Sequence, residues 1–519
     1  MIHAGTYNRQ SQRNVYTFHS TPRLLFPVID KADDLERDVA LVMVHCHDNI
    51  IPAAQSLGEN AVRRDRTDGV DALGLGSLDV NGSQMNKILM RLLDIKNRQI
   101  GVITLDKDLN IDEVTEIFIR INSQGAKLNQ ADFAMSKIAA NTEYGGNALR
   151  KAIDYFSHLA VEPDWYADMA KDDGFMGTRY AEKLKWLKDD RESIFDPDYN
   201  DILRIAFMYK FGRAKLKDLV SLLGGRDFET RDYRETIAEE SFAKLSDGVI
   251  DFMSQYTFSN FVLGMKTAGF ISNKLINSQM TLDFAYTLYL LLNNDPTIER
   301  SQIKHYVAKW FVMSTLTSRY IGSPESQMDF DIRRIREKGF MTFFKEVEEA
   351  ELSDTFWNVG LVQNLETQVI NSPFFNVFLA AQIYEGNNAL FSNGTKVGYL
   401  ITLMGDVHHI FPKQYLRKNG YDEKRLYNQI ANFTYLDTQV NKGISDDAPN
   451  VYFKNAIEAC ENGKTLYGNI ADTATLRQNL QENCIPESIV DMDYSNYPDF
   501  LASRRKLMAK KIQNYYKSL

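Results

Sequence analysis

Cysteine is scarce in this chain of 519 residues, which contains only three, at positions 46, 460 and 484. Cysteines so few and so widely spaced exclude a disulfide framework and a zinc ribbon, and they are typical of a reducing compartment. A run of about 18 apolar residues, which a membrane-spanning helix requires, is also missing. The residues from Met1 to Ala4 do not begin a signal peptide. These absences predict a cytoplasmic protein that makes no use of a membrane.

An excess of positive charge is lacking as well. The formal net charge is −9, which is the opposite of what a typical nucleic-acid-binding protein carries. Net charge is an average, however, whereas contacts with phosphate are local, so this balance does not exclude a nucleic-acid partner. With 44% hydrophobic and 12% aromatic residues, the chain is not disordered, and it is long enough for two to four domains.

Two adjacent histidines, His408 and His409, carry the clearest chemical signal. They follow a β-like run at residues 400–403 and precede Ile410-Phe411-Pro412, where the proline cannot donate to a strand ladder. Consecutive strand residues point to opposite faces, so both rings can serve one site only where the strand end bends.

Two asparagines follow the histidines at positions that complete a pattern. Asn432 lies in a second strand-like run, residues 430–436, and Asn441 stands at the start of a predicted helix. Strand, loop, strand and helix, with His-His, Asn and Asn in that order, predict a ββα-metal finger between Asp406 and Asn450.

This segment resembles an HNH endonuclease domain, of the subtype found at the C-terminus of GmrSD-type (type IV, modification-dependent) restriction proteins. The matching residues are Asp406-Val407-His408-His409-Ile410-Phe411-Pro412, Ile430-Ala431-Asn432-Phe433 and Asn441-Lys442. The resemblance implies that His409 is the general base and that Asn432 orients its ring. It also implies that His408 and Asn441 hold a metal ion.

The chemistry of phosphodiester hydrolysis fits these residue types. A neutral imidazole can take a proton from water at cellular pH. With only His408 and Asn441 as protein ligands, most of the metal's ligands must be water and substrate phosphate, which suits Mg²⁺ or Mn²⁺. Lys413 and Lys442 are the candidate contacts with the DNA backbone.

Simpler interpretations of the same residues remain open. The two histidines could be a surface pair, or one buried and one exposed residue. Asn432 could cap a turn, and Asn441 could be the N-cap of a helix, a position that asparagine favours.

The segment Glu116 to Leu128 resembles the end of the N-terminal domain of the same family, which has a ParB/sulfiredoxin-like core. The family's Asp-Gly-Gln-Gln-Arg motif, tied to nucleotide hydrolysis, is absent, because the nearest string, at residues 68–71, reads Asp-Gly-Val-Asp. We therefore expect a partial or diverged domain of this kind over residues 1–143, without its nucleotide chemistry. After it, Asn129 and Asp132 have the spacing of a helix-capping pair.

Helical apolar spacing dominates from residue 144 to 370, which predicts a helical scaffold. The nuclease domain is expected over 371–519. The predicted fold class is thus mostly α with a small α+β part: a helical scaffold, a C-terminal ββα-metal (HNH) finger and a partial ParB-like domain. Two arginine-rich and lysine-rich stretches, residues 333–336 and 504–517, either contact nucleic acid or form solvated helix faces.

The function predicted from these patterns is a metal-dependent endonuclease acting on DNA, including modified DNA, in defence against phage or other foreign DNA. The alternative is a non-catalytic DNA-binding or regulatory protein with a degenerate sensor domain. A nucleotide hydrolase is not favoured, because the Asp-Gly-Gln-Gln-Arg motif tied to that activity is absent. Sequence patterns do not decide the oligomeric state, and a homo-oligomer is left open.

Overall fold

The computed structural model describes residues 2–4, 16–18, 129–227, 230, 232–403 and 407–519. The chain divides into two compact units, Met1–Ala139 and Ala140–Leu519. Most sequence-based expectations for the first unit, including the ParB-like segment at Glu116–Leu128, lie outside the described residues.

The described part of the first unit contains one small sheet and the beginning of a helix. Strand β1 (Ile2–Ala4) pairs antiparallel with β2 (Tyr16–Phe18). Helix α7 (Gln130–Ala140) begins with the predicted cap, in which Asn129 Oδ1 accepts the N–H of Asp132 at 2.9 Å. In return, Asp132 Oδ2 accepts the N–H of Asn129 at 2.8 Å, so the capping prediction is confirmed.

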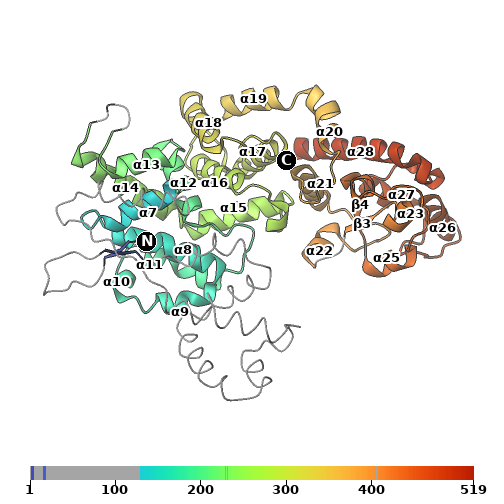
Figure 1. The fold of residues 1–519 in the computed structure, drawn as a ribbon, viewed down its shortest axis with the longest axis horizontal. Coiled ribbons are helices and arrows are strands. Elements are labelled where there is room, and N and C mark those ends of the chain that lie inside the picture. The colour runs from blue at the N-terminus through green and yellow to red at the C-terminus, as the bar shows by residue number, and fades with distance from the viewer. Residues whose placement is uncertain (1, 5–15, 19–128, 228–229, 231, 404–406) are drawn as a thin grey trace, which may run out of the picture. The chain divides into compact units, whose positions relative to one another are not determined.

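The second unit is mostly helical, as the sequence predicts (Figure 1). Its first part contains α8 (Gly146–Val161), η1 (Pro163–Trp165), α9 (Tyr166–Met169), α10 (Asp173–Met176), α11 (Ala181–Leu184), η2 (Lys185–Asp189), α12 (Tyr199–Phe211), α13 (Leu216–Leu223), α14 (Glu235–Phe252), α15 (Gln255–Thr267), η3 (Asn273–Leu275), α16 (Gln279–Asn293), η4 (Arg300–Gln302), α17 (Ile303–Leu316), α18 (Pro324–Lys338), α19 (Phe340–Glu351), the π-helical turn η5 (Phe356–Gly360), α20 (Leu361–Asn364) and α21 (Pro373–Tyr384).

The C-terminal part surrounds a two-stranded sheet. It contains α22 (Val397–Thr402), β3 (Val407–His409), α23 (Lys413–Lys418), α24 (Lys424–Tyr427), η6 (Ile430–Asn432), β4 (Phe433–Tyr435), α25 (Thr438–Ile444), α26 (Pro449–Glu461), α27 (Thr473–Glu482), η7 (Glu487–Asp491), η8 (Tyr494–Asn496) and α28 (Tyr497–Ser518). None of the helices in the described part of the chain combines the length and hydropathy needed to cross a membrane.

Helix α16 lies at the centre of the scaffold and packs against both α12 and α17. Its residues from Thr281 to Leu290 are all buried, which is expected of a helix enclosed on every side. Aromatic rings fill the space beside it, and Tyr286 packs edge-on against Phe252 and at a tilt against Phe261, at centroid distances of 5.3 and 4.8 Å. The Tyr286 hydroxyl donates to the Phe252 carbonyl at 2.8 Å, so this buried polar atom is satisfied.

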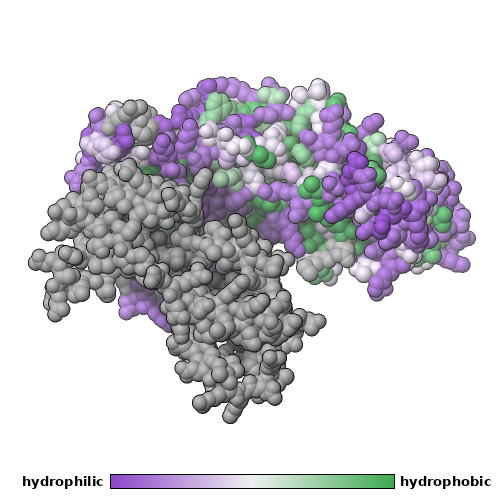
Figure 2. Space-filling model, in the orientation of Figure 1, coloured by the Kyte–Doolittle hydropathy of each residue, from purple (hydrophilic) through white to green (hydrophobic). Residues whose placement is uncertain are grey.

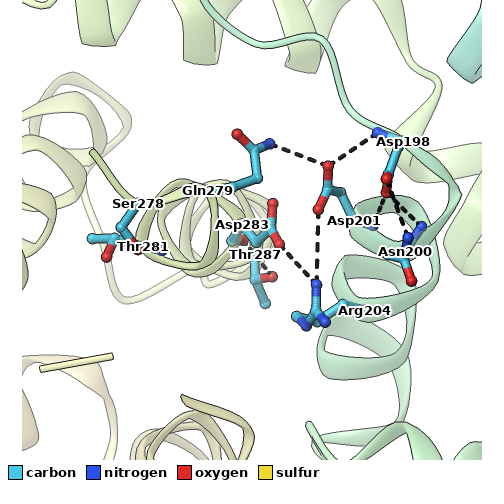
Figure 3. A network of polar contacts seen from close by, with 9 residues as sticks. All are labelled: Asp198, Asn200, Asp201, Arg204, Ser278, Gln279, Thr281, Asp283 and Thr287. Atoms are coloured by element: carbon cyan, nitrogen blue, oxygen red, sulfur yellow. Dashed lines mark hydrogen bonds and ion pairs between the residues drawn. The ribbon is translucent and has the colours of Figure 1, made fainter. Parts of the chain in front are cut away.

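A buried polar network joins the first two turns of α12 with the first two turns of α16 (Figure 3). The Arg204 guanidinium donates to Asp283 Oδ2 at 3.1 Å and lies 3.8 Å from Asp201 Oδ1. Gln279 Nε2 also donates to Asp201, at 3.2 Å. Burial raises the pKa of Asp201 to about 6, and burial together with the Asp201 charge raises that of Asp283 well above its usual value. One arginine therefore faces two carboxyl groups that burial disposes to hold a proton.

Helices α21 and α28 connect the scaffold to the C-terminal part. Helix α21 packs against both α17 and α28. Near the end of α28, the Tyr516 hydroxyl donates to Glu348 Oε1 of α19 at 2.7 Å. Residues 140–519 therefore form one compact unit. In Figure 2, hydrophobic surface gathers over α21 and α22, beside the more hydrophilic surface of the C-terminal helices.

The sheet differs from the sequence-based expectation in its first strand. Residues 400–402, expected to be β-like, end helix α22, in which Val397, Leu400 and Ile401 are buried at helical spacing. A short apolar run fits either structure, and here the i, i+3, i+4 pattern prevails. The strand instead begins at Val407, so both histidines lie within it rather than beyond its end.

Candidate functional site

The two histidines lie on opposite faces of the β3–β4 pair. His409 is opposite Phe433, and His408 is opposite Thr434, in antiparallel register. Because directly opposed residues share a face, His409 belongs to the face with Phe433 and His408 to the other. The strand does not bend to bring both rings to one side.

His409 lines a cavity of about 430 Å³. The lining residues come from both strands, from α24 and from the segment before α21: Gln368, Val369, Ile370, Val407, His409, Lys424, Asn428 and Phe433. The imidazole meets the Phe433 ring edge-on, with centroids 5.1 Å apart. The lining thus combines apolar side chains with an imidazole, an ammonium group and two amides.

A side-chain amide holds the His409 ring in place. Nε2 of His409 lies 3.2 Å from Oδ1 of Asn428. Asn428 Nδ2 donates to the Gln368 carbonyl at 3.4 Å, which directs Oδ1 toward the ring. An oxygen acceptor at Nε2 requires the proton on that nitrogen, so Nδ1 keeps its lone pair.

The environment keeps this imidazole neutral. Burial lowers the pKa of His409, the hydrogen bond that the ring donates to Asn428 Oδ1 raises it in part, and the Lys413 charge lowers it further. A neutral, oriented ring with a free lone pair is the form that accepts a proton from water.

The Asn432 side chain is not in the position expected for a residue that orients the His409 ring. Its side chain is fully buried; Oδ1 accepts the Phe411 N–H at 2.8 Å, and Nδ2 donates to the carbonyls of Phe411 and Tyr427 at 3.1 and 3.3 Å. These backbone groups belong to buried residues and need hydrogen-bond partners inside the protein. Asn432 therefore ties the chain after β3 to the turn before β4, and Asn428 makes the contact with His409.

His408 is a buried, neutral imidazole. Its side chain is on the face of Thr434, and the residue is 8% exposed. Burial, with a smaller contribution from the His409 charge, lowers its pKa to about 4. Its Nε2 is buried without a hydrogen-bond partner, which is unusual for a polar atom in a folded protein.

Asn441 lies inside helix α25, and the N-cap of that helix is Asp437. The Asp437 side chain accepts the Gln439 N–H at 2.8 Å, so the N-cap interpretation of Asn441 is wrong. Between residues 407 and 519, no hydrogen bond joins the Asn441 side chain to His408 or His409. The described residues contain no group of three or more His, Cys, Asp or Glu side chains that could hold a metal ion. The predicted metal ligands, His408 and Asn441, are only two residues, so this absence does not bear on them.

Lysines near the cavity and basic residues farther away differ in whether a carboxylate of the described residues pairs with them. Lys424 lines the cavity, and Lys413 Nζ lies over the Tyr427 ring, 5.4 Å from its centroid. Within the described chain, no carboxylate lies within ion-pair distance of either lysine, nor of the exposed Lys442. By contrast, Lys418 is paired with Asp446, and Arg425 with Glu423 at 2.5 Å. Among the described residues, positive charge beside His409 therefore has no carboxylate partner.

The basic stretch of helix α28 begins with an arginine that faces the protein interior rather than a DNA-binding surface. Arg504 is fully buried and donates to the carbonyls of Ala431, Phe433 and Asn483 at 2.7 to 3.1 Å. It therefore stabilises the backbone around β4. Arg505 is paired with Glu366 at 3.2 Å, whereas Lys506, Lys510 and Lys517 are exposed.

The arginines at the end of α18 are engaged within the protein. Arg333 pairs with Asp329 at 2.5 Å, and Arg334 with Glu337 at 3.0 Å. Arg336 donates to the Tyr209 carbonyl at 2.8 Å. This pattern favours the solvated, intramolecularly paired interpretation of the stretch.

Sequence reasoning missed Asn428, Lys424 and Gln368 as residues of this site. Several asparagines lie within this segment, and their spacing does not show which one faces the ring. Gln368 lies about forty positions before the strand, with no motif around it.

Comparisons with known proteins add little to this description. No family model matches the chain, and no solved structure matches it. An uncharacterized protein of Methanocaldococcus jannaschii is 29% identical over 165 residues, which cover 30% of this chain and 26% of that protein. The chain thus spans about a quarter of the length of the curated relative that it matches.

Proposed function

We propose that this protein is a metal-dependent HNH endonuclease that hydrolyses DNA phosphodiester bonds, in defence against foreign or modified DNA. The observation that carries the proposal is the neutral His409, held by Asn428 in a cavity beside Lys413 and Lys424, neither of which has a carboxylate partner among the described residues. The resemblance of residues 406–442 to HNH domains supplies the reaction class. GmrSD-type restriction proteins are the family in which we place the chain by this resemblance.

In the proposed mechanism, His409 Nδ1 accepts a proton from a water molecule as the water oxygen bonds to phosphorus. The bond from phosphorus to the 3′ oxygen then breaks, and that oxygen leaves with a proton from solvent. Asn428 keeps the ring in the required tautomer throughout. Lys413 and Lys424 hold the phosphate backbone at the cavity, and Lys442 is a further candidate contact.

A divalent ion would be held by His408 and Asn441. The unpartnered Nε2 of His408 and its lowered pKa fit a ligand, because only neutral imidazole binds a metal. When bound, Mg²⁺ or Mn²⁺ would supply Lewis-acid stabilisation of a phosphate and its leaving oxygen, and at the phosphate facing His409 this requires His408 to turn from the opposite face of the β3–β4 pair.

One observation favours the alternative of a non-catalytic DNA-binding or regulatory protein. His408 is buried on the face of the sheet opposite His409. A chain that kept the lysines and the fold but not a metal site would bind DNA without cutting it.

The experiment that separates the two uses purified full-length protein with modified and unmodified phage DNA. Each DNA is incubated with Mg²⁺, Mn²⁺ or EDTA, with and without nucleotides. The proposal expects cutting that requires metal and that falls by about 100-fold to 10,000-fold in His409→Ala. The matched control is His158→Ala, which removes a half-exposed histidine of α8 outside the cavity.

Thermal melting of both variants checks that the fold survives. DNA binding in EDTA without cutting in any metal would establish the alternative. Cutting by His409→Ala at the wild-type rate would reject the proposed base.

A further inference from the structure

Two large apolar side chains among the residues that line the His409 cavity are exposed to solvent. Val369 and Ile370 lie in the segment between α20 and α21, and they are 55% and 44% exposed. Both line the cavity that contains His409. Single exposed apolar residues are common, but two adjacent ones at the edge of a candidate active site call for a partner.

The backbone that carries these two residues is fixed to the rest of the site. The Thr367 carbonyl accepts the Ile430 N–H at 2.9 Å, and the Gln368 carbonyl accepts Asn428 Nδ2 at 3.4 Å. On the other side, the Val369 carbonyl accepts the Ser372 N–H at 3.0 Å. The side chains are therefore presented from a held segment, and Asn428 links that segment directly to the His409 ring.

The composition of the cavity points to DNA as the partner. Apolar side chains make up part of its lining, and the ammonium groups of Lys413 and Lys424, which have no carboxylate partner in the described chain, are close by. A nucleic acid offers both complements, because its phosphates attract the lysines and its stacked bases accept an apolar side chain between them.

We propose that Val369 and Ile370 form an apolar wedge that enters the DNA base stack beside the phosphate facing His409. This inference rests on the proposed function and adds the class of substrate: duplexes that unstack readily at the cut, such as flexible pyrimidine–purine steps and mismatches. Inserted apolar side chains unstack a base step and kink the duplex, and the energy required depends on the sequence deformed.

The test compares the wild type with the double variant Val369→Ser/Ile370→Ser on two DNA duplexes of one sequence, fully paired and with a central mismatch. A 2-aminopurine beside the mismatch position reports unstacking by its fluorescence. The matched control is Val161→Ser/Ile321→Ser, which removes one valine and one isoleucine that are 70% and 67% exposed and lie outside the cavity.

With EDTA present, wild-type protein should raise the fluorescence of the paired duplex, and the double variant should not. With metal, the double variant should cut the paired duplex about tenfold more slowly but the mismatched duplex less than about threefold more slowly. Val369→Leu/Ile370→Leu, which keeps the apolar character, should restore both signals.

The outcomes distinguish the wedge from the nuclease. Equal fluorescence and equal cutting by the double variant and the control would overturn the wedge and leave the nuclease standing. Wedge-dependent fluorescence without cutting by wild-type protein in any metal would establish the wedge and reject the nuclease. Absence of DNA binding would reject both.

Discussion

Oδ1 of Asn428 lies 3.2 Å from Nε2 of His409, and the other end of the same amide is held by the Gln368 carbonyl. This contact connects the strand that presents the imidazole to the segment that precedes α21. The candidate base is therefore oriented by a residue outside the pattern that the resemblance implied.

The pH dependence of cutting should follow the groups around His409. A base acts when deprotonated, so the rate rises as pH passes its pKa. Asn428 raises this pKa and the Lys413 charge lowers it. Asn428→Ala should therefore shift the acid limb of the kcat profile to lower pH and reduce kcat, and Lys413→Gln should shift the limb to higher pH. Shifts in the same direction for both variants would contradict the assignment.

Asn432 should matter for stability rather than for the ionisation of His409. Its amide serves three buried backbone contacts, so Asn432→Ala should lower the free energy of unfolding by about 3 kcal/mol. Urea unfolding measures this loss. Asn419→Ala is the control, because it removes one local bond to the Tyr415 carbonyl and should cost about 1 kcal/mol or less. A shifted pH profile in a folded Asn432→Ala protein would restore the orienting role to Asn432.

The unpaired lysines should set the salt dependence of DNA binding. Lys413→Gln and Lys424→Gln should each reduce the slope of log K against log salt concentration by about 0.9, as expected for one lost phosphate contact. Lys418→Gln is the matched control, because Lys418 is paired with Asp446 in the same segment. Fluorescence anisotropy in EDTA separates these effects from cutting. Equal slopes in all three variants would show that DNA binds elsewhere.

The buried network of α12 and α16 should make stability fall as pH rises. The folded-state pKa of Asp201 is raised to about 6 and that of Asp283 is raised well above its usual value, in both cases first by burial. Above about pH 4 the unfolded chain has released these protons, while the folded chain still holds them. Each of the two carboxyl groups therefore lowers the free energy of unfolding by up to about 1.4 kcal/mol per pH unit.

Asp283→Asn resembles the protonated acid and can still accept from Arg204. Relative to the wild type, its melting temperature should therefore decline less between about pH 4 and pH 6. Parallel pH profiles of the two proteins would show that Asp283 does not carry the effect.

Sequence by itself determined the features that depend on near neighbours. The Asn129–Asp132 cap was predictable because both hydrogen bonds span three residues, and α12, α16 and α17 were predictable from their apolar spacing. The short run at residues 400–403 was not, because four apolar residues fit a strand or a helical turn equally well.

Tertiary structure alone decided which polar groups meet at the site. Asn428 and Asn432 are chemically identical and four positions apart, and only the turn before β4 sends one to His409 and the other to Phe411. Arg504 belongs to a basic run in the sequence, but it is buried because three carbonyls around β4 and α27 need a donor. Hydrogen bonds between distant segments form only after the chain has packed, so residue spacing does not reveal them.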